Sequence, residues 1–122
     1  MFAETQISGK HMICDIKEIR NKKLLHDLEG IKSLLDTICN QNDFSILEKV
    51  EYKFHPEGLT LLYLLSESHI SIHTFPERNY IALDLYTCRT YNDNKTYLDI
   101  YNTLIEEFKA KKEKPMIIDR SF

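Results

Sequence analysis

The sequence predicts an α+β protein: a two-layer sandwich of one mainly antiparallel sheet with two helices on one face. Apolar residues recur at helical spacing in only two long segments, whereas six shorter segments alternate or run apolar, as strands do. Two helices cannot cover both faces of a six-stranded sheet, so we expect both on the same face. The other face must then be polar or be buried by a partner.

The first half of the chain is expected to hold two strands and one helix. Residues 10–16 alternate weakly, which indicates a first strand. Asn21 can cap a helix in which leucine and isoleucine recur three and four positions apart from Leu24 to Ile38. Residues 44–54 have the pattern of a second strand, which ends at the turn signal of residues 55–58.

The middle of the chain is expected to supply three consecutive strands. Residues 59–65 are apolar at nearly every position, which predicts a central strand covered on both faces. The next two strands are expected at residues 68–75 and 80–88, and residues 76–79 join them.

A second amphipathic helix is expected near the end of the chain, with Asp93 or Asn94 as its cap. Its apolar face holds Tyr97, Ile100, Tyr101, Leu104 and Phe108. The lysine-rich residues 109–114 continue the helical pattern, so we interpret them as the solvated end of this helix, stopped by Pro115. Residues 116–118 can add a last edge strand.

Length and charge restrict the function classes. A chain of 122 residues with 43% hydrophobic residues suits a single domain spanning residues 1–122. The net charge of −3 is spread along the chain and gives no basic patch for nucleic acid. The longest apolar run, residues 59–65, is far shorter than the ~18 residues that suggest a membrane span. The opening residues also lack the apolar segment of a signal peptide.

Cysteine usage indicates a reducing compartment. Three cysteines in a chain without an export signal argue against a disulfide framework and favour the cytoplasm. Cys14 and Cys39 lie among apolar residues, which predicts that they are small core fillers. Cys88 differs, because it ends a strand that also carries polar side chains.

Strand alternation predicts that the side of the sheet without helices carries polar and ionisable side chains. In residues 68–75 the isoleucines point to one side of the sheet, which leaves on the other His69, Ser71 and His73. In residues 80–88 the same rule places on that side Tyr80, Asp84, Tyr86 and Cys88.

Pattern alone leaves several interpretations of this face open. His69 and His73 are four residues apart, which spans ~13 Å on a strand, too far for one metal ion, so no metal site is expected. Cys88 and His73 could face each other across the strands as a nucleophilic pair, although no orienting partner or oxyanion loop is evident. The plainest interpretation is a polar face exposed to water.

One motif on this face resembles a known family. Residues 66–77, SESHISIHTFPE, closely resemble the self-processing segment of prokaryotic S-adenosylmethionine decarboxylases, whose pattern is roughly SESHxxIHTWPE. The family follows it with a D-x-[FY]-T-C stretch, which is matched here by residues 84–88. Residues 9–11 (Gly-Lys-His) and 54–58 (Phe-x-Pro-x-Gly) extend the resemblance, which covers most of the chain.

The resemblance implies a proenzyme that makes its own cofactor. The chain would cut itself between Glu67 and Ser68 into a β chain of residues 1–67 and an α chain of residues 68–122. The Ser68 hydroxyl would attack the Glu67 carbonyl, and Ser68 would become a covalent pyruvoyl group that forms a Schiff base with the substrate.

Further site residues are implied by matching positions. His73 matches a histidine that transfers protons during processing, and Cys88 matches the proton donor in decarboxylation. Phe54 matches an aromatic that stacks on adenine, and Thr60 stands where the family commonly has a processing serine. Glu77 matches a carboxylate at the substrate-binding edge.

The implied activity is the decarboxylation of S-adenosylmethionine, whose product donates aminopropyl groups for the synthesis of spermidine and other polyamines. Members of the family form a homodimer of cleaved protomers, a four-layer αββα arrangement with the active sites between the two sheets. A partner of this kind would cover the polar face, and neither nucleic acid nor a membrane is expected as a partner.

Several positions depart from the family pattern, and most of them lie around the pocket. Phe75 replaces tryptophan, residues 52–53 (Tyr-Lys) replace His-Arg, residues 60–61 (Thr-Leu) replace Ser-Gly, and Arg89 replaces glycine. These departures leave open a paralogous ornithine or arginine decarboxylase with the same cofactor. An uncleaved regulatory homologue is a further alternative, against which the retained processing residues argue.

Overall fold

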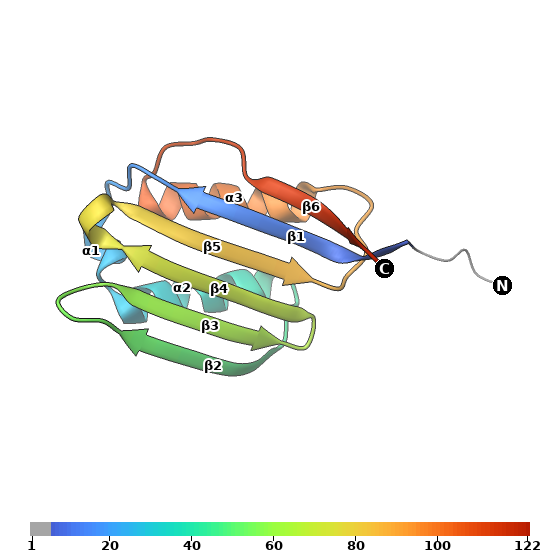
Figure 1. The fold of residues 1–122 in the computed structure, drawn as a ribbon, viewed down its shortest axis with the longest axis horizontal. Helices are drawn as coiled ribbons and strands as arrows, with labels where there is room; N and C mark the ends of the chain where they lie inside the picture. Colours follow the sequence, from blue (N-terminus) through green and yellow to red (C-terminus); the bar gives the residue numbers. More distant parts are fainter. Residues whose placement is uncertain (1–5) are drawn as a thin grey trace.

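The computed structural model describes residues 6–122, in which six strands form one sheet and the helices lie on one face of it (Figure 1). The strands are β1 (Ile7–Ile16), β2 (Ile46–Lys53), β3 (Leu59–Leu65), β4 (Ser68–Phe75), β5 (Tyr80–Thr87) and β6 (Met116–Ser121). They lie in the order β2-β3-β4-β5-β1-β6, and each neighbouring pair is antiparallel. The helices are α1 (Lys22–Leu25), α2 (Leu28–Gln41) and α3 (Lys95–Phe108), and the 3₁₀ turn η1 (Pro76–Arg78) joins β4 to β5. The predicted α+β fold class is confirmed, as is the order in which the six strands follow one another along the chain.

The first predicted helix is two helices. The apolar spacing continues from Leu24 to Leu28, but α1 ends at Leu25 and α2 begins at Leu28. Asp27 caps the second helix, because its carboxylate accepts a hydrogen bond of 3.0 Å from the Gly30 N–H. A Cβ at Gly30 would lie 2.6 Å from a side-chain oxygen of Asp27, so a larger residue there would displace the capping carboxylate. Asn21 caps α1, as predicted.

The helix α3 ends earlier than its lysine-rich continuation predicts. It stops at Phe108, and Lys109 turns away with a φ of +50°. The last carbonyls of α3 are taken by the segment before α1: the Asn21 amide groups donate to Glu107 (2.7 Å) and Phe108 (3.0 Å). Residues 109–114 therefore form a connection to β6 and not a helix end.

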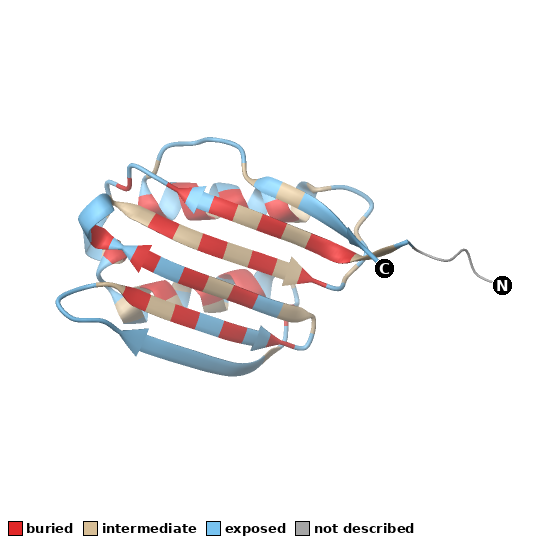
Figure 2. Cartoon of the chain, viewed as in Figure 1, coloured by how far each residue is buried: buried red, intermediate tan, exposed pale blue. Residues whose placement is uncertain are grey.

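The core lies between the sheet and the helices, as the alternation predicts (Figure 2). Ile70 and Ile72 of β4 are 2% and 0% exposed, and the predicted apolar stripe of α3 is buried along its length. Cys14 and Cys39 are free thiols in this core, where burial raises their pKa to about 12 and about 11. Both are core fillers, as predicted, whereas Cys88 is exposed.

The opposite face of the sheet is left uncovered by the described part of the chain. The predicted cover on both faces of β3 is wrong within this chain, because Leu62 and Leu64 are 42% and 53% exposed. Val50 and Tyr52 of β2 are exposed on the neighbouring strand. Within the described residues, β3 is therefore apolar on both sides but covered on only one.

Among residues 6–122, no helix is long and apolar enough to cross a membrane. The signal-peptide expectation concerns in part residues 1–5, which lie outside the described residues.

Candidate active site

The tip of the β3–β4 hairpin holds the bond at which the sequence predicts a cut. Leu65 pairs with Ser68, so Ser66 and Glu67 form a two-residue loop. Ser68 has a φ of +151°, outside the regions that a residue with a Cβ adopts readily. Such a conformation costs on the order of 1–3 kcal/mol and is typical of functional sites. The strain falls on the residue that follows the predicted cut.

The carbonyl group of Glu67 is held by a backbone donor at the end of β5. Ser68 pairs with Thr87, which brings Cys88 beside the loop. The Cys88 N–H donates a hydrogen bond of 2.8 Å to the Glu67 carbonyl oxygen. Such a donor favours attack on the carbonyl, because it already faces the oxygen on which charge develops. The structure therefore brings Glu67, Ser68 and Cys88 together at one end of the sheet, which we call the cut end.

The side chain of Glu67 is also bound on several sides. Its carboxylate accepts hydrogen bonds from the Ser66 hydroxyl (2.7 Å), the Ser45 N–H (2.9 Å) and the Arg89 guanidinium (3.2 Å). The Ser66 bond first, and then those of Ser45 and Arg89, hold the pKa of Glu67 below its usual range. The sequence predicts no role for Ser45, and it marks Arg89 only as a departure from the family pattern.

A second group of predicted site residues lies at the opposite end of the sheet, which we call the pocket end. These residues line a hollow of about 350 Å³: Phe54, Thr60, His73 and Glu77. The Thr60 hydroxyl and the His73 Nδ1 are 2.9 Å apart across β3 and β4. Phe54 is fixed by its N–H bond of 2.8 Å to the Gly58 carbonyl, where a φ of +107° requires glycine.

The cut end and the pocket end are far apart in one chain. Ser68 and His73 are five positions apart on β4, which corresponds to ~16 Å along a strand. The cross-strand neighbours of His73 are Thr60 and Ala82, whereas Cys88 follows the partner of Ser68. The alternative of a Cys88–His73 nucleophilic pair is therefore wrong within a single chain.

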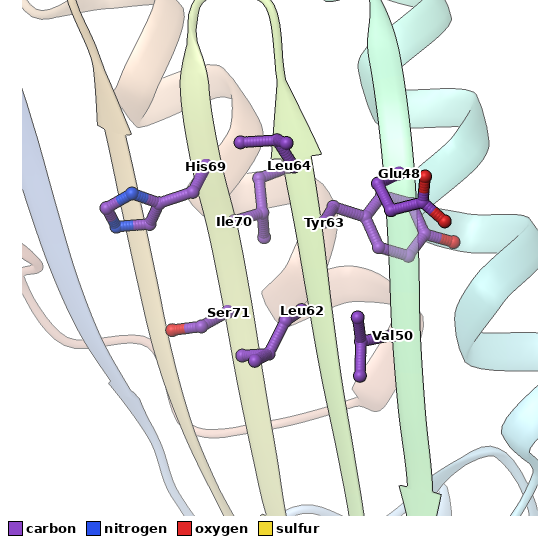
Figure 3. Close-up of a pocket in the computed structure, with 8 residues that line it drawn as sticks. All are labelled: Glu48, Val50, Leu62, Tyr63, Leu64, His69, Ile70 and Ser71. Atoms are coloured by element: carbon purple, nitrogen blue, oxygen red, sulfur yellow. The ribbon is translucent and has the colours of Figure 1, made fainter.

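Between the two ends, the open face carries exposed apolar side chains over β2 and β3. Val50, Leu62 and Leu64 line a hollow of about 360 Å³ across β2 and β3, with His69 and Ser71 of β4 beside them (Figure 3). Within residues 6–122, no three or more histidine, cysteine, aspartate or glutamate side chains are grouped closely enough to hold a metal ion.

Comparison with known proteins identifies the family. The model of the family described as S-adenosylmethionine decarboxylase matches residues 10–121. The chain belongs to this family. The S-adenosylmethionine decarboxylase proenzyme 2 of Bacillus cereus is 40% identical over 100 residues, which cover 81% of this chain and 80% of the relative. The corresponding proenzyme of Archaeoglobus fulgidus is 28% identical over 114 residues, 93% of this chain and 98% of that protein.

The fold agrees with this assignment. The crystal structure of the adenosylmethionine decarboxylase from Aquifex aeolicus VF5 superposes with a TM-score of 0.82 at 26% identity. The match covers 97% of this chain and 94% of that one. The resemblance of residues 66–77 to S-adenosylmethionine decarboxylases is therefore confirmed at the level of the whole chain.

Proposed function

We propose that this chain is the proenzyme of a pyruvoyl-dependent S-adenosylmethionine decarboxylase that cuts itself between Glu67 and Ser68. Family membership supports the carboxy-lyase activity and the substrate, and with them a role in supplying aminopropyl groups for spermidine and other polyamines. The relatives described above do not favour an ornithine or arginine decarboxylase. The three free cysteines suit a cytoplasmic enzyme.

The single observation that carries the position of the cut is the geometry of the hairpin tip. A serine with a φ of +151° follows a carbonyl that is already hydrogen-bonded to the Cys88 N–H. The donor set at this point suits the formation of a pyruvoyl group, because it combines a nucleophilic hydroxyl, a polarised carbonyl and stored strain. Once formed, the group supplies a carbonyl that accepts the electrons released as CO₂ leaves.

The cutting step uses the chain's own residues. The Ser68 oxygen bonds to the Glu67 carbonyl carbon, the C–N bond breaks, and the hydroxyl proton passes to the Ser68 nitrogen, which leaves an ester and a free amine. Removal of the Ser68 α-proton then breaks the ester C–O bond and releases Glu67 as a carboxylate. Water hydrolyses the resulting dehydroalanine to the pyruvoyl group and ammonia. During the attack the Cys88 N–H holds the oxygen on which negative charge develops. Breaking the peptide bond also relieves the strained φ of Ser68. Attack therefore needs only local groups, apart from a proton carrier.

That proton carrier is proposed to come from a second copy of the chain. His73 lies too far from Ser68 to act on it within one protomer, given the ~16 Å between them. A two-fold pairing of the open faces would bring the cut end of each protomer against the pocket end of its partner. It would also bury the exposed side chains of Val50, Leu62 and Leu64. The proposed enzyme is therefore a homodimer with αββα layers.

The roles of the remaining residues follow from this pairing. Cys88 presents an exposed thiol at the cut end, where it serves as the proton donor after CO₂ leaves. Phe54 is 48% exposed and lies with its ring centroid 4.7 Å from that of Tyr52, so an aromatic face is available to adenine. Thr60 supports processing through His73, and Glu77 lies at the edge of the substrate pocket.

Mass spectrometry under denaturing conditions tests the cut, and trapping of CO₂ tests the activity. We expect wild-type protein to give fragments 1–67 and 68–122, and Ser68→Ala to give one intact chain. Wild-type protein should release CO₂ from S-adenosylmethionine, with ornithine and arginine as control substrates. Cleavage of the Ser68→Ala chain at the same bond would mean that an outside protease makes the cut, and the proposal would be lost.

A further inference from the structure

Arg89 reaches from the end of β5 to two separate segments of the chain. Its guanidinium donates to the backbone carbonyls of Asn42 (2.8 Å) and Asp43, which directly follow α2. It also donates to the Glu67 carboxylate at 3.2 Å and lies over the Phe44 ring, 5.1 Å from its centroid. The planar guanidinium can make all of these contacts at once, because its N–H groups point in fixed directions.

We propose that Arg89 is a positioning residue for self-cleavage: by holding the Glu67 carboxylate, it keeps the Glu67 carbonyl on the Cys88 N–H and beside the Ser68 hydroxyl. This inference rests on the proposed cut between Glu67 and Ser68. It assigns to Arg89 a task in making the cofactor and none in the decarboxylation itself.

Glu67 is held through both its backbone and its side chain. Cys88 holds its backbone oxygen, and the adjacent residue Arg89 holds its side chain, so one short segment fixes both ends of the residue. Glu67 belongs to a two-residue loop at the tip of a hairpin, outside the residue pairs that join β3 to β4. Fixing both the carbonyl and the carboxylate restricts rotation about the Glu67 backbone bonds, which decides where the carbonyl carbon lies.

Arg89 is itself well anchored. Asn42 is the C-terminal cap of α2, where unpaired carbonyls carry partial negative charge that favours a cation. The guanidinium therefore ties the hairpin tip to the end of a helix and not to a mobile surface group. Since misplacement of reacting groups by ~1 Å can cost about 10²-fold in rate, such an anchor has a kinetic consequence.

The charge of Arg89 also suits the product. The cut turns Glu67 into a chain terminus, which adds an α-carboxylate to the side-chain carboxylate already present. Arg89 lies 3.2 Å from that side chain and offsets part of the added negative charge. A neutral residue at position 89 would leave both carboxylates without this partner.

The rate of cleavage tests the proposal, measured by following the intact chain and its fragments by mass spectrometry after synthesis in a cell-free system. Arg89→Ala should slow cleavage by about tenfold or more, and Arg89→Lys should recover part of the rate. Added guanidinium ion should speed the Arg89→Ala chain. Arg20→Ala is the matched control, because Arg20 also donates to a backbone carbonyl beyond a helix end, that of Lys109, and should cleave at the wild-type rate.

A double substitution separates positioning from a general structural role. Glu67→Gln keeps the shape of the side chain but puts an NH₂ group among donors, so it should also slow cleavage. If Arg89 acts through Glu67, the double variant should be no slower than the slower single variant. If the slowing caused by the two substitutions adds in the double variant, the proposal is overturned. If Arg89→Ala fails to fold, the proposal is overturned when Arg89→Lys and Glu67→Gln both cleave at the wild-type rate.

The same experiment distinguishes this inference from the function on which it rests. If wild-type chain is not cut at Glu67–Ser68, the proposed function fails. If wild-type chain is cut and Arg89→Ala is cut equally fast, the proposed function stands and only the role of Arg89 is lost.

Discussion

The cut end and the pocket end of the sheet are held in different ways. At the cut end, Glu67 is fixed through its carbonyl and through three donors to its carboxylate, and its side chain is only 14% exposed. At the pocket end, Phe54 and Phe75 are 48% and 39% exposed, and His73 bonds to Thr60. The cut end is held by contacts within its own chain, whereas the pocket end leaves aromatic side chains exposed to solvent.

This difference indicates what each end can do alone. Attack on a peptide bond needs its carbonyl held in place, and at the cut end a backbone donor and anchored side chains hold the carbonyl and the carboxylate of Glu67. A pocket for a substrate with an aromatic base can remain open until the substrate and a second protomer close it. Variants that affect one end and spare the other test this difference.

The largest expected effect is complementation between two inactive chains. Ser68→Ala removes the nucleophile and His73→Ala removes the proposed proton carrier, so each variant made alone should remain uncut. When both are synthesised together, about half of the His73→Ala chains should pair with a Ser68→Ala partner and be cut. Mass separates the two chains in the same sample. His73→Ala chains that stay uncut in the mixture would contradict a site shared between protomers.

The next effect concerns Cys88, whose backbone and side chain have different proposed tasks. Cys88→Ala keeps the N–H that holds the Glu67 carbonyl, so self-cleavage should proceed. Loss of the thiol should lower turnover of S-adenosylmethionine by about 10²–10⁴-fold, as expected for a missing general acid. Cys88→Ser, with a weaker acid of similar size, should fall between. Normal turnover by Cys88→Ala would remove its side chain from the mechanism.

A smaller effect is expected from Phe54 at the pocket end. Phe54→Ala should weaken binding of S-adenosylmethionine to the cleaved protein by about ten- to a hundredfold, because one aromatic face for adenine is lost. Calorimetry measures this affinity, and the rate of self-cleavage should not change. Leu98→Ala, which removes an exposed apolar side chain from α3, is the matched control. Equal affinities of the Phe54→Ala and wild-type proteins would place adenine elsewhere.

Much of the fold could be predicted because strand alternation is a local property. Ile70 and Ile72 bury one face of β4, and the polar residues between them define the other. The break between α1 and α2 was not predicted, since Leu24 and Leu28 keep helical spacing across it. The available signal was Asp27 followed three residues later by Gly30, whose N–H it caps.

The sequence motifs name the site residues but do not give their positions relative to one another. The motif marks Glu67, Ser68, His73 and Cys88, but it does not state that His73 lies at the far end of the strand. The strand spacing that excludes a metal between His69 and His73 also separates Ser68 from His73 by ~16 Å. The contacts of Arg89 could not be predicted, because its partners Asn42 and Asp43 are 47 and 46 positions away in the chain.

The smallest effect separates the two ends by pH. The pKa of Glu67 is held below its usual range, so its carboxylate contributes stability that is present above the unfolded-state pKa and is lost as pH falls through the lower folded-state pKa. In a Ser68→Ala background, which keeps the hairpin uncut, Glu67→Gln should lower the melting temperature at neutral pH by about a few degrees. The difference should shrink as pH falls through the range below the usual pKa of glutamate, because protonation removes the same charge. Glu77→Gln in that background is the matched control from the pocket end. If the difference in melting temperature between the Glu67→Gln and parent chains is unchanged at acidic pH, the Glu67 side chain is held by its shape and not by its charge.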